Sequence, residues 1–197
     1  MEECWGELKT HRLILRAVEE ADAVDLMVVF GNQSMMIGNS VAAPVLDIDE
    51  LLSVVRKQSS TLQAMNDSPF YVLERASDGK VIGVIYFNSL QNGCGDIAYF
   101  IAKRYQRCGY MSEALIALME HFFGDCHLKC LTASYAKENT ASARLLHNCG
   151  FQSMPQAKSM MLNDHKYHLI DTCYLKQEEW CERRRRNDDE KRIGAKI

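Results

Sequence analysis

The sequence predicts an α+β (mixed α/β) fold, in which helices flank a central mixed and mostly antiparallel sheet. Two segments with the patterning and turn residues of β-hairpins, 70–88 and 160–175, lie on either side of a strand–helix–strand–helix centre over residues 96–148. Hairpins pair their strands antiparallel, whereas a helical crossover leads to a parallel strand. The combination argues against a purely doubly wound sheet.

The composition is that of one globular domain. Of the 197 residues, 47% are hydrophobic and 25% are charged, which argues against disordered, fibrous and collagen-like chains. Lys and Arg number 23 against 26 Asp and Glu, for a net charge of -3, so nothing indicates wholesale binding to nucleic acid or to a membrane. No apolar run reaches the roughly 18 residues of a membrane span, and the acidic start is unlike a signal peptide. We expect a cytoplasmic protein.

The first third of the chain predicts one strand and two helices. Residues 8–17 have strand character, and residues 19–30 carry apolar side chains at helical spacing. A capping-box-like start at Asp47 predicts a helix over 47–66. The glycines and the proline of residues 31–46 predict a loop between the two helices.

The remainder of the chain alternates strands and helices. Apolar residues recur at offsets 0, 4, 7, 8 and 11 from Met111, which predicts a helix with one buried face. Gly150 is suited to end the helix that begins at Thr140. The expected elements are strands over 70–76, 81–88, 96–102, 128–135, 160–162 and 167–175, and helices from 111 onward and over 140–148.

Eight cysteines raise the question of disulfides and metal ligands. A chain of this length, rich in core-forming residues, does not need disulfides for its stability. Cys126, His127 and Cys130 are the nearest approach to a metal cluster, and no Cys-x-x-Cys motif is present. On a strand, Cys126 and Cys130 would share one buried face. We therefore predict no metal site.

The most informative segment leads from a strand through a short basic loop to Gly109, just before a helix. Amide N–H groups at a helix start have no partner within the helix. Together with the helix dipole and the flanking Lys103, Arg104 and Arg107, they form an anion-binding nest. The alternative is a plain turn that needs glycine for its backbone, with solvated arginines. The pattern is neither a Walker A loop nor a Gly-x-Gly-x-x-Gly turn.

Four motifs in one order give this segment a context. Gln106-Arg-Cys-Gly-Tyr-Met111 resembles the Gln/Arg-x-x-Gly-x-Gly/Ala acetyl-CoA loop of the GNAT N-acetyltransferases. Residues 138–151 resemble the Asn-x-x-Ser…Gly-Phe segment of that family. Thr10 to Arg16 is similar to the opening of its RimJ/RimL-type branch, and residues 171–180 are similar to the last strand and exit of that branch.

The resemblance implies a single GNAT-type domain over residues 8–180. It leaves a charged C-terminal tail over residues 181–197. Because an acidic run directly follows Arg183–Arg186, we interpret these arginines as solvated.

By the same resemblance, acetyl-CoA is the cosubstrate and these motifs bind it. Its pantetheine arm would run beside the strand like an added strand. Asn139 would both cap a helix and hydrogen-bond the pantetheine. The implied cofactor-binding residues are Phe100, Ile101 and Ala102 on the strand, Gln106, Arg107, Cys108, Gly109, Tyr110, Met111 and Ser112 around the pyrophosphate, and Asn139 and Ser142.

In such enzymes the acetyl group passes directly to an amine, which must first lose a proton. The resemblance assigns catalytic roles to Asp96, where relatives often carry a carboxylate, and to Ser142, which corresponds to a serine near the CoA sulfur. Their alternatives are a polar residue at a strand edge and a serine in the first turn of a helix. The chain departs from the family at Leu146, where many members have a general-acid Tyr, and at Met111, where the loop has a small residue.

The sequence therefore predicts an acetyl-CoA-dependent N-acetyltransferase that acts on a primary amine. The amine would belong to a protein N-terminus, such as that of a ribosomal protein, or to a small molecule. A non-catalytic acetyl-CoA sensor is one alternative, and a ribosome- or RNA-associated module that uses Arg183–Arg186 is another. We expect a monomer or homodimer without a metal, a membrane or a nucleic-acid partner. The sequence does not name the acetyl acceptor.

Overall fold

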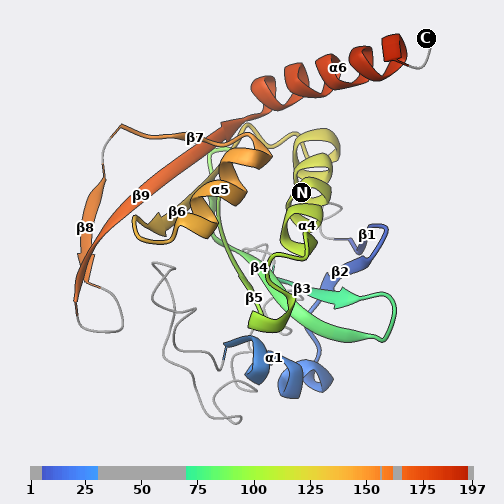
Figure 1. The fold of residues 1–197 in the computed structure, drawn as a ribbon, viewed down its shortest axis with the longest axis vertical. Coiled ribbons are helices and arrows are strands. Elements are labelled where there is room, and N and C mark those ends of the chain that lie inside the picture. The colour runs from blue at the N-terminus through green and yellow to red at the C-terminus, as the bar shows by residue number, and fades with distance from the viewer. Residues whose placement is uncertain (1–5, 31–69, 156, 162–165, 195–197) are drawn as a thin grey trace.

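A computed structural model of the chain describes residues 6–30, 70–155, 157–161 and 166–194. In these ranges one sheet carries helices on both of its faces (Figure 1). The loop expected over 31–46 and the helix expected over 47–66 lie outside the described residues.

Among the residues that the structure describes, the strands form one nine-stranded sheet in the order β1–β2–β3–β4–β5–β6–β9–β7, with β8 paired to β9. Every pair is antiparallel except β5 with β6, which is parallel. The predicted mixed, mostly antiparallel sheet is confirmed. The strands are β1 (Leu8–Lys9), β2 (Leu13–Ala17), β3 (Phe70–Arg75), β4 (Lys80–Gln91), β5 (Cys94–Ile101), β6 (Cys130–Ala136), β7 (Gln152–Ser153), β8 (Lys158–Met161) and β9 (Tyr167–Lys176).

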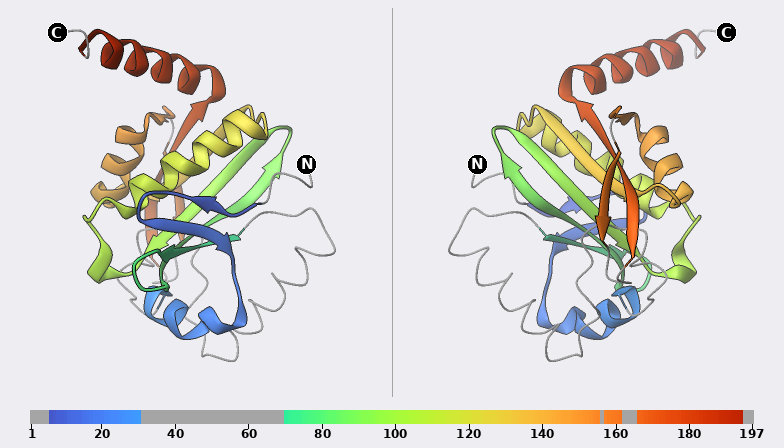
Figure 2. Two further views of the ribbon diagram at one scale, coloured as in Figure 1. Left: turned by 90° about the vertical axis from the view of Figure 1, so that its right-hand side faces the viewer. Right: turned by 90° about the vertical axis from the view of Figure 1, so that its left-hand side faces the viewer.

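Helices α4 and α5 lie on one face of the sheet and α1 lies on the other (Figure 1, Figure 2). The core beneath α4 includes Ile97 and Tyr99 of β5, whereas Phe100 of the same strand packs with α1. This division follows from the alternation of side chains along a strand. The helices are α1 (Ala23–Phe30), preceded by the 3₁₀ turn η2 (Glu20–Asp22); α4 (Tyr110–Met119), continued by the π-helix η4 (Glu120–Asp125); α5 (Thr140–Cys149); and α6 (Gln177–Gly194).

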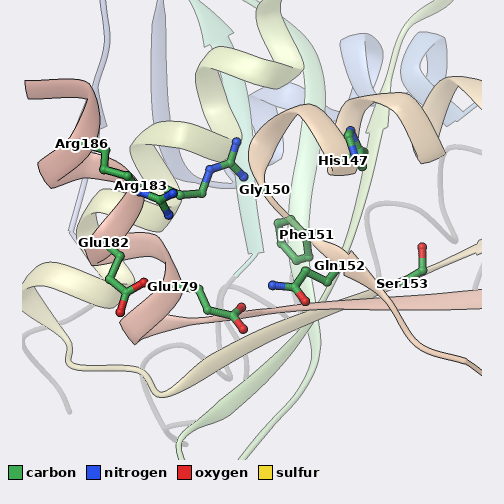
Figure 3. A pocket seen from close by; sticks show the side chains of 9 residues that line it. All are labelled: His147, Gly150, Phe151, Gln152, Ser153, Glu179, Glu182, Arg183 and Arg186. Atoms are coloured by element: carbon green, nitrogen blue, oxygen red, sulfur yellow. The ribbon is translucent and has the colours of Figure 1, made fainter. Parts of the chain in front are cut away.

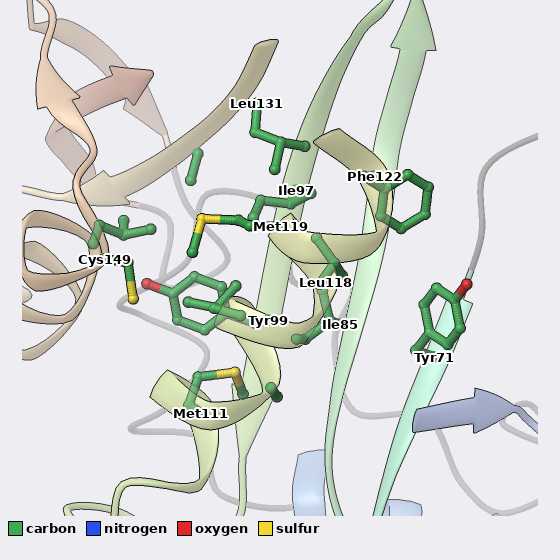
Figure 4. Packing of buried hydrophobic residues seen from close by; sticks show 14 of the residues in the cluster. Tyr71, Ile85, Ile97, Tyr99, Met111, Leu118, Met119, Phe122, Leu131 and Cys149 are labelled. Carbon is green, nitrogen blue, oxygen red and sulfur yellow. The ribbon is translucent and has the colours of Figure 1, made fainter. Parts of the chain in front are cut away.

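The apolar pattern that begins at Met111 forms the buried face of α4. All of its members belong to one core cluster, and Figure 4 shows Met111, Leu118 and Met119 packed near Tyr99 of β5. The predicted helix is therefore confirmed. Because Met111 begins this stripe in the first turn of α4, the loop before the helix is held close to the end of β5.

The single strand expected over residues 8–17 was wrong, since this segment forms two strands that pair antiparallel across a tight turn. Thr10 makes the turn, because its Oγ1 accepts the N–H of Leu13 at 2.9 Å and its own N–H donates to Leu13 O at 2.9 Å. Local side-chain hydrogen bonds of threonine compete in this way with strand pairing. The turn brings Arg12 to the start of α4.

The expectation about cysteines also needs a correction, since Cys94 and Cys130 form a disulfide. The two residues lie directly opposite each other in the parallel pair of β5 and β6, with Cα atoms 4.6 Å apart, a separation that disulfides require. Cys126 follows η4 and is not on a strand. The strand face predicted for Cys126 and Cys130 was wrong because β6 begins only at Cys130.

The charged C-terminal segment forms most of α6, which projects from the body of the domain (Figure 2). Its first turns contact η4: Gln177 Nε2 donates to Phe123 O at 2.6 Å, and the Trp180 ring lies 6.3 Å from that of Phe123. The domain boundary expected at residue 180 therefore falls inside α6, whose first turns pack against the domain. In the described part of the chain, none of the helices has the length and apolar character needed to cross a lipid bilayer.

Candidate active site

The loop that leads to α4 has the backbone of an anion-binding nest. After the 3₁₀ turn η3 (Lys103–Tyr105), Arg107 and Gly109 adopt the left-handed conformation, with φ of 60° and 81°. Left-handed residues between ordinary ones can turn successive N–H groups toward one side. Gly109 is also the N-cap of α4, and no side chain of the described residues caps this end. The amides of the first helical turn are therefore open.

The loop amides are available to an incoming anion. Among the described residues, the N–H groups of Arg107, Cys108 and Gly109 have no protein acceptor. The side chains of Lys103, Arg104 and Arg107 are exposed around them. Open amides, a helix N-terminus and three cations make this loop suitable for a phosphate group.

The predicted cofactor-binding residues occupy two environments. The loop from Gln106 to Gly109 is exposed, while Tyr110 and Ser112 are half-buried. Met111 is 6% exposed and points into the core. Its size therefore does not obstruct the open side of the loop. On the strand side, Phe100 and Ala102 are buried and Ile101 is partly buried.

Close to this loop, the parallel strands β5 and β6 separate. Their pairing ends at Ile97 and Ala133, although β5 continues to Ile101 and β6 to Ala136. Because β4 pairs with only one edge of β5, the opposite edge beyond Ile97 faces this opening. An extended, amide-bearing ligand can pair with such an edge as an added strand would.

Asp96 lies at the base of the opening, one residue before the pairing ends. Its half-buried carboxylate accepts hydrogen bonds from Thr132 Oγ1 at 2.8 Å and from Asn88 Nδ2 at 2.9 Å. Asn88 reaches it because the register of β4 shifts between Phe87 and Ser89, and a bulge of this kind re-aims a side chain. The two donors fix the orientation of the carboxylate.

A row of aromatic rings lies on the sheet face that bears Asp96. Tyr86 stacks between Phe70 and Phe100, with ring centroids 5.5 Å and 6.3 Å away. Burial, with a smaller contribution from the charge of Asp96, raises the pKa of Tyr86 to about 12. The phenol therefore keeps its proton at neutral pH, and this face presents a carboxylate beside an apolar wall.

Ser142 lies in the first turn of α5 and is 7% exposed. Asn139 caps this helix by accepting the N–H of Ser142 at 3.1 Å, which confirms the predicted cap. The Ser142 side chain lies near the buried Tyr99 hydroxyl. Burial raises the pKa of Tyr99, and the nearby Ser142 side chain lowers it in part. Leu146 is buried in the core, and its hydrocarbon side chain cannot act as a general acid.

The structure does not bring Asp96 and Ser142 together on one face. Asp96 lies on the face of β5 that also bears Phe100, whereas Ser142 lies near Tyr99, on the face beneath α4. The opening between β5 and β6 connects the two faces. A ligand in this opening would have Asp96 on one side and Ser142 on the other.

Sequence reasoning missed Asn88 and Thr132, which hold Asp96. Thr132 could have been found only from the register of the parallel pair. The register shift that turns Asn88 toward Asp96 could not be predicted from the residues of β4. The proximity of Tyr99 to Ser142 depends on where α5 lies.

The described residues also form cavities outside the opening. A pocket of about 540 Å³ lies between α6, β7 and the end of α5 (Figure 3). In it the Arg183 guanidinium rests against Gly150. The end of α5 is about 15 Å from Asn139, given ten residues at 1.5 Å each. A second cavity of about 370 Å³, lined by residues that include Arg12 and Tyr110, lies beside the anion-binding loop.

The diverging strands, the open loop and the sheet order define a GNAT-type acyltransferase fold, and a sequence comparison agrees. Residues 12–152, more than half of the chain, match the family model of the acetyltransferase (GNAT) domain. The chain therefore belongs to the GNAT acetyltransferase family, and the predicted N-acetyltransferase assignment is confirmed.

Individual relatives support the same assignment. The chain is 27% identical to the N-acetyltransferase p20 of Bacillus licheniformis over 169 residues, 83% of this chain and 91% of that protein. It is 25% identical to the ribosomal protein uS5-alanine N-acetyltransferase of Escherichia coli over 171 residues, 80% of this chain and 84% of the relative. A structure of RimL, the ribosomal L7/L12 α-N-protein acetyltransferase, in complex with coenzyme A shares the fold, with a TM-score of 0.74 and 20% identity over 87% of this chain and 98% of that one.

Proposed function

We propose that the protein transfers the acetyl group of acetyl-CoA to a primary amine of a protein N-terminus or a small molecule. The observation that carries this proposal is the separation of β5 from β6 close to a loop with open amides. The loop amides can bind the pyrophosphate of acetyl-CoA, and the free edge of β5 can pair with its amide-bearing pantetheine arm. The alternatives of a sensor or an RNA-associated module are not favoured, because the chain is a GNAT acetyltransferase.

In this proposal the pyrophosphate is bound by the amides from Gln106 to Ser112. The pantetheine arm pairs with the free edge of β5 at Phe100–Ala102. Asn139 contributes to the same arm from the start of α5, in addition to its cap. These assignments are supported by the exposure of the loop and by the end of strand pairing at Ile97.

Asp96 takes the proton that the attacking amine must lose. An ammonium has no lone pair, so deprotonation precedes or accompanies the attack on the acetyl carbonyl. The amine nitrogen then forms a bond to the carbonyl carbon, and the bond from that carbon to sulfur breaks. The orientation of the carboxylate by Thr132 and Asn88 supports this role, with proton transfer directly or through one water.

The departing thiolate requires a proton or a hydrogen-bond donor. Leu146 cannot supply one. We assign this task to Ser142, which is buried on the opposite side of the opening from Asp96 and lies near the Tyr99 hydroxyl. The raised pKa of Tyr99 keeps that hydroxyl protonated, so no negative charge develops beside Ser142 at neutral pH.

Among primary amines, an N-terminal alanine is the first acceptor to test, because the relative from Escherichia coli acts on the alanine of a ribosomal protein. Phe70 and Tyr86, the half-buried members of the aromatic row, offer apolar surface to the residues that follow such an amine. Free amino acids and polyamines are the other acceptors to compare.

Steady-state release of free thiol from acetyl-CoA tests the proposal. The panel contains peptides with N-terminal Ala or Ser, the same peptides with a blocked N-terminus, single amino acids and polyamines. Amine-dependent thiol release with an acetylated product, confirmed by mass spectrometry, supports the proposal. Acetyl-CoA binding without turnover on any amine would favour the sensor, and absence of binding would overturn the proposal.

A further inference from the structure

Arg12 connects the N-terminal turn to both sides of Gly109. Its Nη1 donates to Cys108 O at 3.0 Å, and its guanidinium lies 4.4 Å from the ring centroid of Tyr110. Its Nη2 lies 3.3 Å from the position that a Cβ on Gly109 would take. We propose that Arg12, anchored by Glu113, is a positioning residue that presents the loop amides to the pyrophosphate of acetyl-CoA. This inference rests on the proposed function.

The contact with Cys108 determines which way the next amide points. In a trans peptide, the C=O and the following N–H point in opposite directions, and no cis peptide occurs among the described residues. Because the carbonyl of Cys108 turns toward Arg12, the N–H of Gly109 turns away from Arg12. Arg12 thereby orients a donor without touching the reacting atoms.

Glu113 holds Arg12 through a network of hydrogen bonds. Its Oε1 accepts from Thr10 Oγ1 at 2.6 Å and from the N–H of Arg12 at 2.8 Å, and its Oε2 accepts from Arg12 Nε at 2.7 Å. Burial acts to raise the pKa of Glu113, but the bonds from Thr10 and Arg12 outweigh it and the pKa is lowered. The carboxylate is thus charged at neutral pH.

The ion pair with Arg12 also neutralises the charge of Glu113 near the phosphate-binding amides. Glu113 lies in the first turn of α4, beside the amides that would bind the pyrophosphate. An unpaired carboxylate there would repel the phosphate charges. Arg12 compensates that charge while it orients the loop, so the removal of Arg12 should weaken binding in two ways.

Arg16, on β2, provides a matched comparison. Its guanidinium pairs with Glu74 at 2.6 Å and with both carboxylate oxygens of Asp22 at 2.8 Å. Its side chain is 18% exposed, against 38% for Arg12. Removing Arg16 should therefore cost at least as much stability, because its ion pairs are more buried. Within the described ranges, its partners lie in β2, β3 and η2, and none belongs to the loop.

The test is calorimetric titration of acetyl-CoA into the wild-type protein and the variants Arg12→Gln, Arg12→Lys, Glu113→Gln and Arg16→Gln, with thermal unfolding of each. We expect Arg12→Gln to raise Kd about tenfold or more, the effect of removing one charge-assisted hydrogen bond. The Kd of Arg12→Lys should lie between those of the wild type and Arg12→Gln, since lysine keeps the positive charge but lacks the planar guanidinium. Arg16→Gln should lower Tm yet leave Kd within about twofold.

Kinetics separate positioning from catalysis. Arg12→Gln should raise KM for acetyl-CoA by the same factor as Kd, with kcat at saturation and KM for the amine within about twofold of wild type. A fall in kcat at saturating acetyl-CoA without a change in Kd would overturn the inference. A merely structural role would change Tm alone.

Unchanged affinity in Arg12→Gln overturns the inference, and so does an equal decrease in Arg12→Gln and Arg16→Gln. If Arg12→Gln fails to fold, Glu113→Gln decides: a Kd raised several-fold supports the inference, and an unchanged Kd overturns it. A wild-type protein that does not bind acetyl-CoA would overturn the proposed function, whereas wild-type binding with no effect of Arg12 overturns the inference alone.

Discussion

Asp96 Oδ1 and Thr132 Oγ1 lie 2.8 Å apart across the parallel pair of β5 and β6, directly before that pair separates. Asp96→Asn preserves the size of the side chain but removes its ability to take a proton. We expect kcat to fall by ~10²–10⁴-fold, the usual contribution of general-base catalysis, with the Kd for acetyl-CoA unchanged. Thiol-release kinetics and calorimetric titration measure the two quantities.

Thr132→Val is the control for this change, because it removes the hydrogen bond and leaves the carboxylate in place. We expect it to lower kcat by less than about tenfold, since one neutral hydrogen bond contributes ~0.5–1.5 kcal/mol. An Asp96→Asn enzyme with wild-type kcat would show that another group takes the proton.

Gly109→Val tests the anion-binding loop. Gly109 has φ of 81°, and a Cβ there would lie 3.3 Å from Arg12 Nη2. A β-branched side chain would strain the turn and displace the guanidinium. The loop could then no longer donate two or three charge-assisted hydrogen bonds worth ~1.5–3 kcal/mol each, so affinity for acetyl-CoA should fall at least ~100-fold. The measurement is calorimetry on a variant shown to be folded by circular dichroism.

Gly93→Val is a closely matched control for backbone strain. Gly93 has φ of 77°, and its Cβ would lie 3.2 Å from the side chain of Lys129, at the end of β5 away from the loop. Both variants should be destabilised by ~1–3 kcal/mol through strain. Only Gly109→Val should bind acetyl-CoA more weakly, and an equal decrease in the two would contradict the role of the loop.

Acetyl-CoA should stabilise the folded protein in proportion to its binding. At a concentration one hundred times Kd, the expected increase in the free energy of unfolding is about 2.7 kcal/mol. A thermal-shift series with acetyl-CoA, free CoA and pantetheine separates the contribution of the loop from that of the arm. No shift at millimolar acetyl-CoA would contradict the assignment of the cosubstrate.

Deletion of residues 182–197 should leave acetyl-CoA affinity nearly unchanged. The deletion removes the exposed ion pair of Arg184 with Glu120 and the contact of Arg183 with Gly150, which lies at the far end of α5 from Asn139. Surface ion pairs contribute ~0–1 kcal/mol, so we expect a small decrease in Tm. Calorimetry and thermal unfolding of the truncated chain check both quantities, and a large decrease in affinity would mean that α6 contributes to the site.

Much of the fold could be predicted because its signals are local. The spacing of apolar residues after Met111 predicted α4, and the turn residues between Ala76 and Val81 predicted the hairpin of β3 and β4. Gly109, followed by a helix, predicted a loop with open amides. In each case, a few adjacent residues restrict the backbone or divide the surface into apolar and polar faces, without reference to the rest of the chain.

Other contacts between strands of the sheet could not be predicted from such local signals. The disulfide of Cys94 with Cys130 depends on the register of two parallel strands, and the contact of Asn88 with Asp96 depends on a bulge in β4. The turn at Thr10 was missed because hydrogen bonds of one threonine to Leu13 reverse the chain between β1 and β2. Register and bulges depend on how whole strands pack, so short windows of sequence do not reveal them.

The residue types at the site, Asp96, Ser142 and the glycine of the loop, can be read in the chain itself, because chemistry and backbone freedom belong to single residues. Their arrangement cannot. Tertiary structure alone put Asp96 and Ser142 on opposite sides of one opening and joined Arg12 to Glu113 across 101 positions. Contacts over such separations depend on the packing of helices against the sheet, and no local pattern encodes that packing.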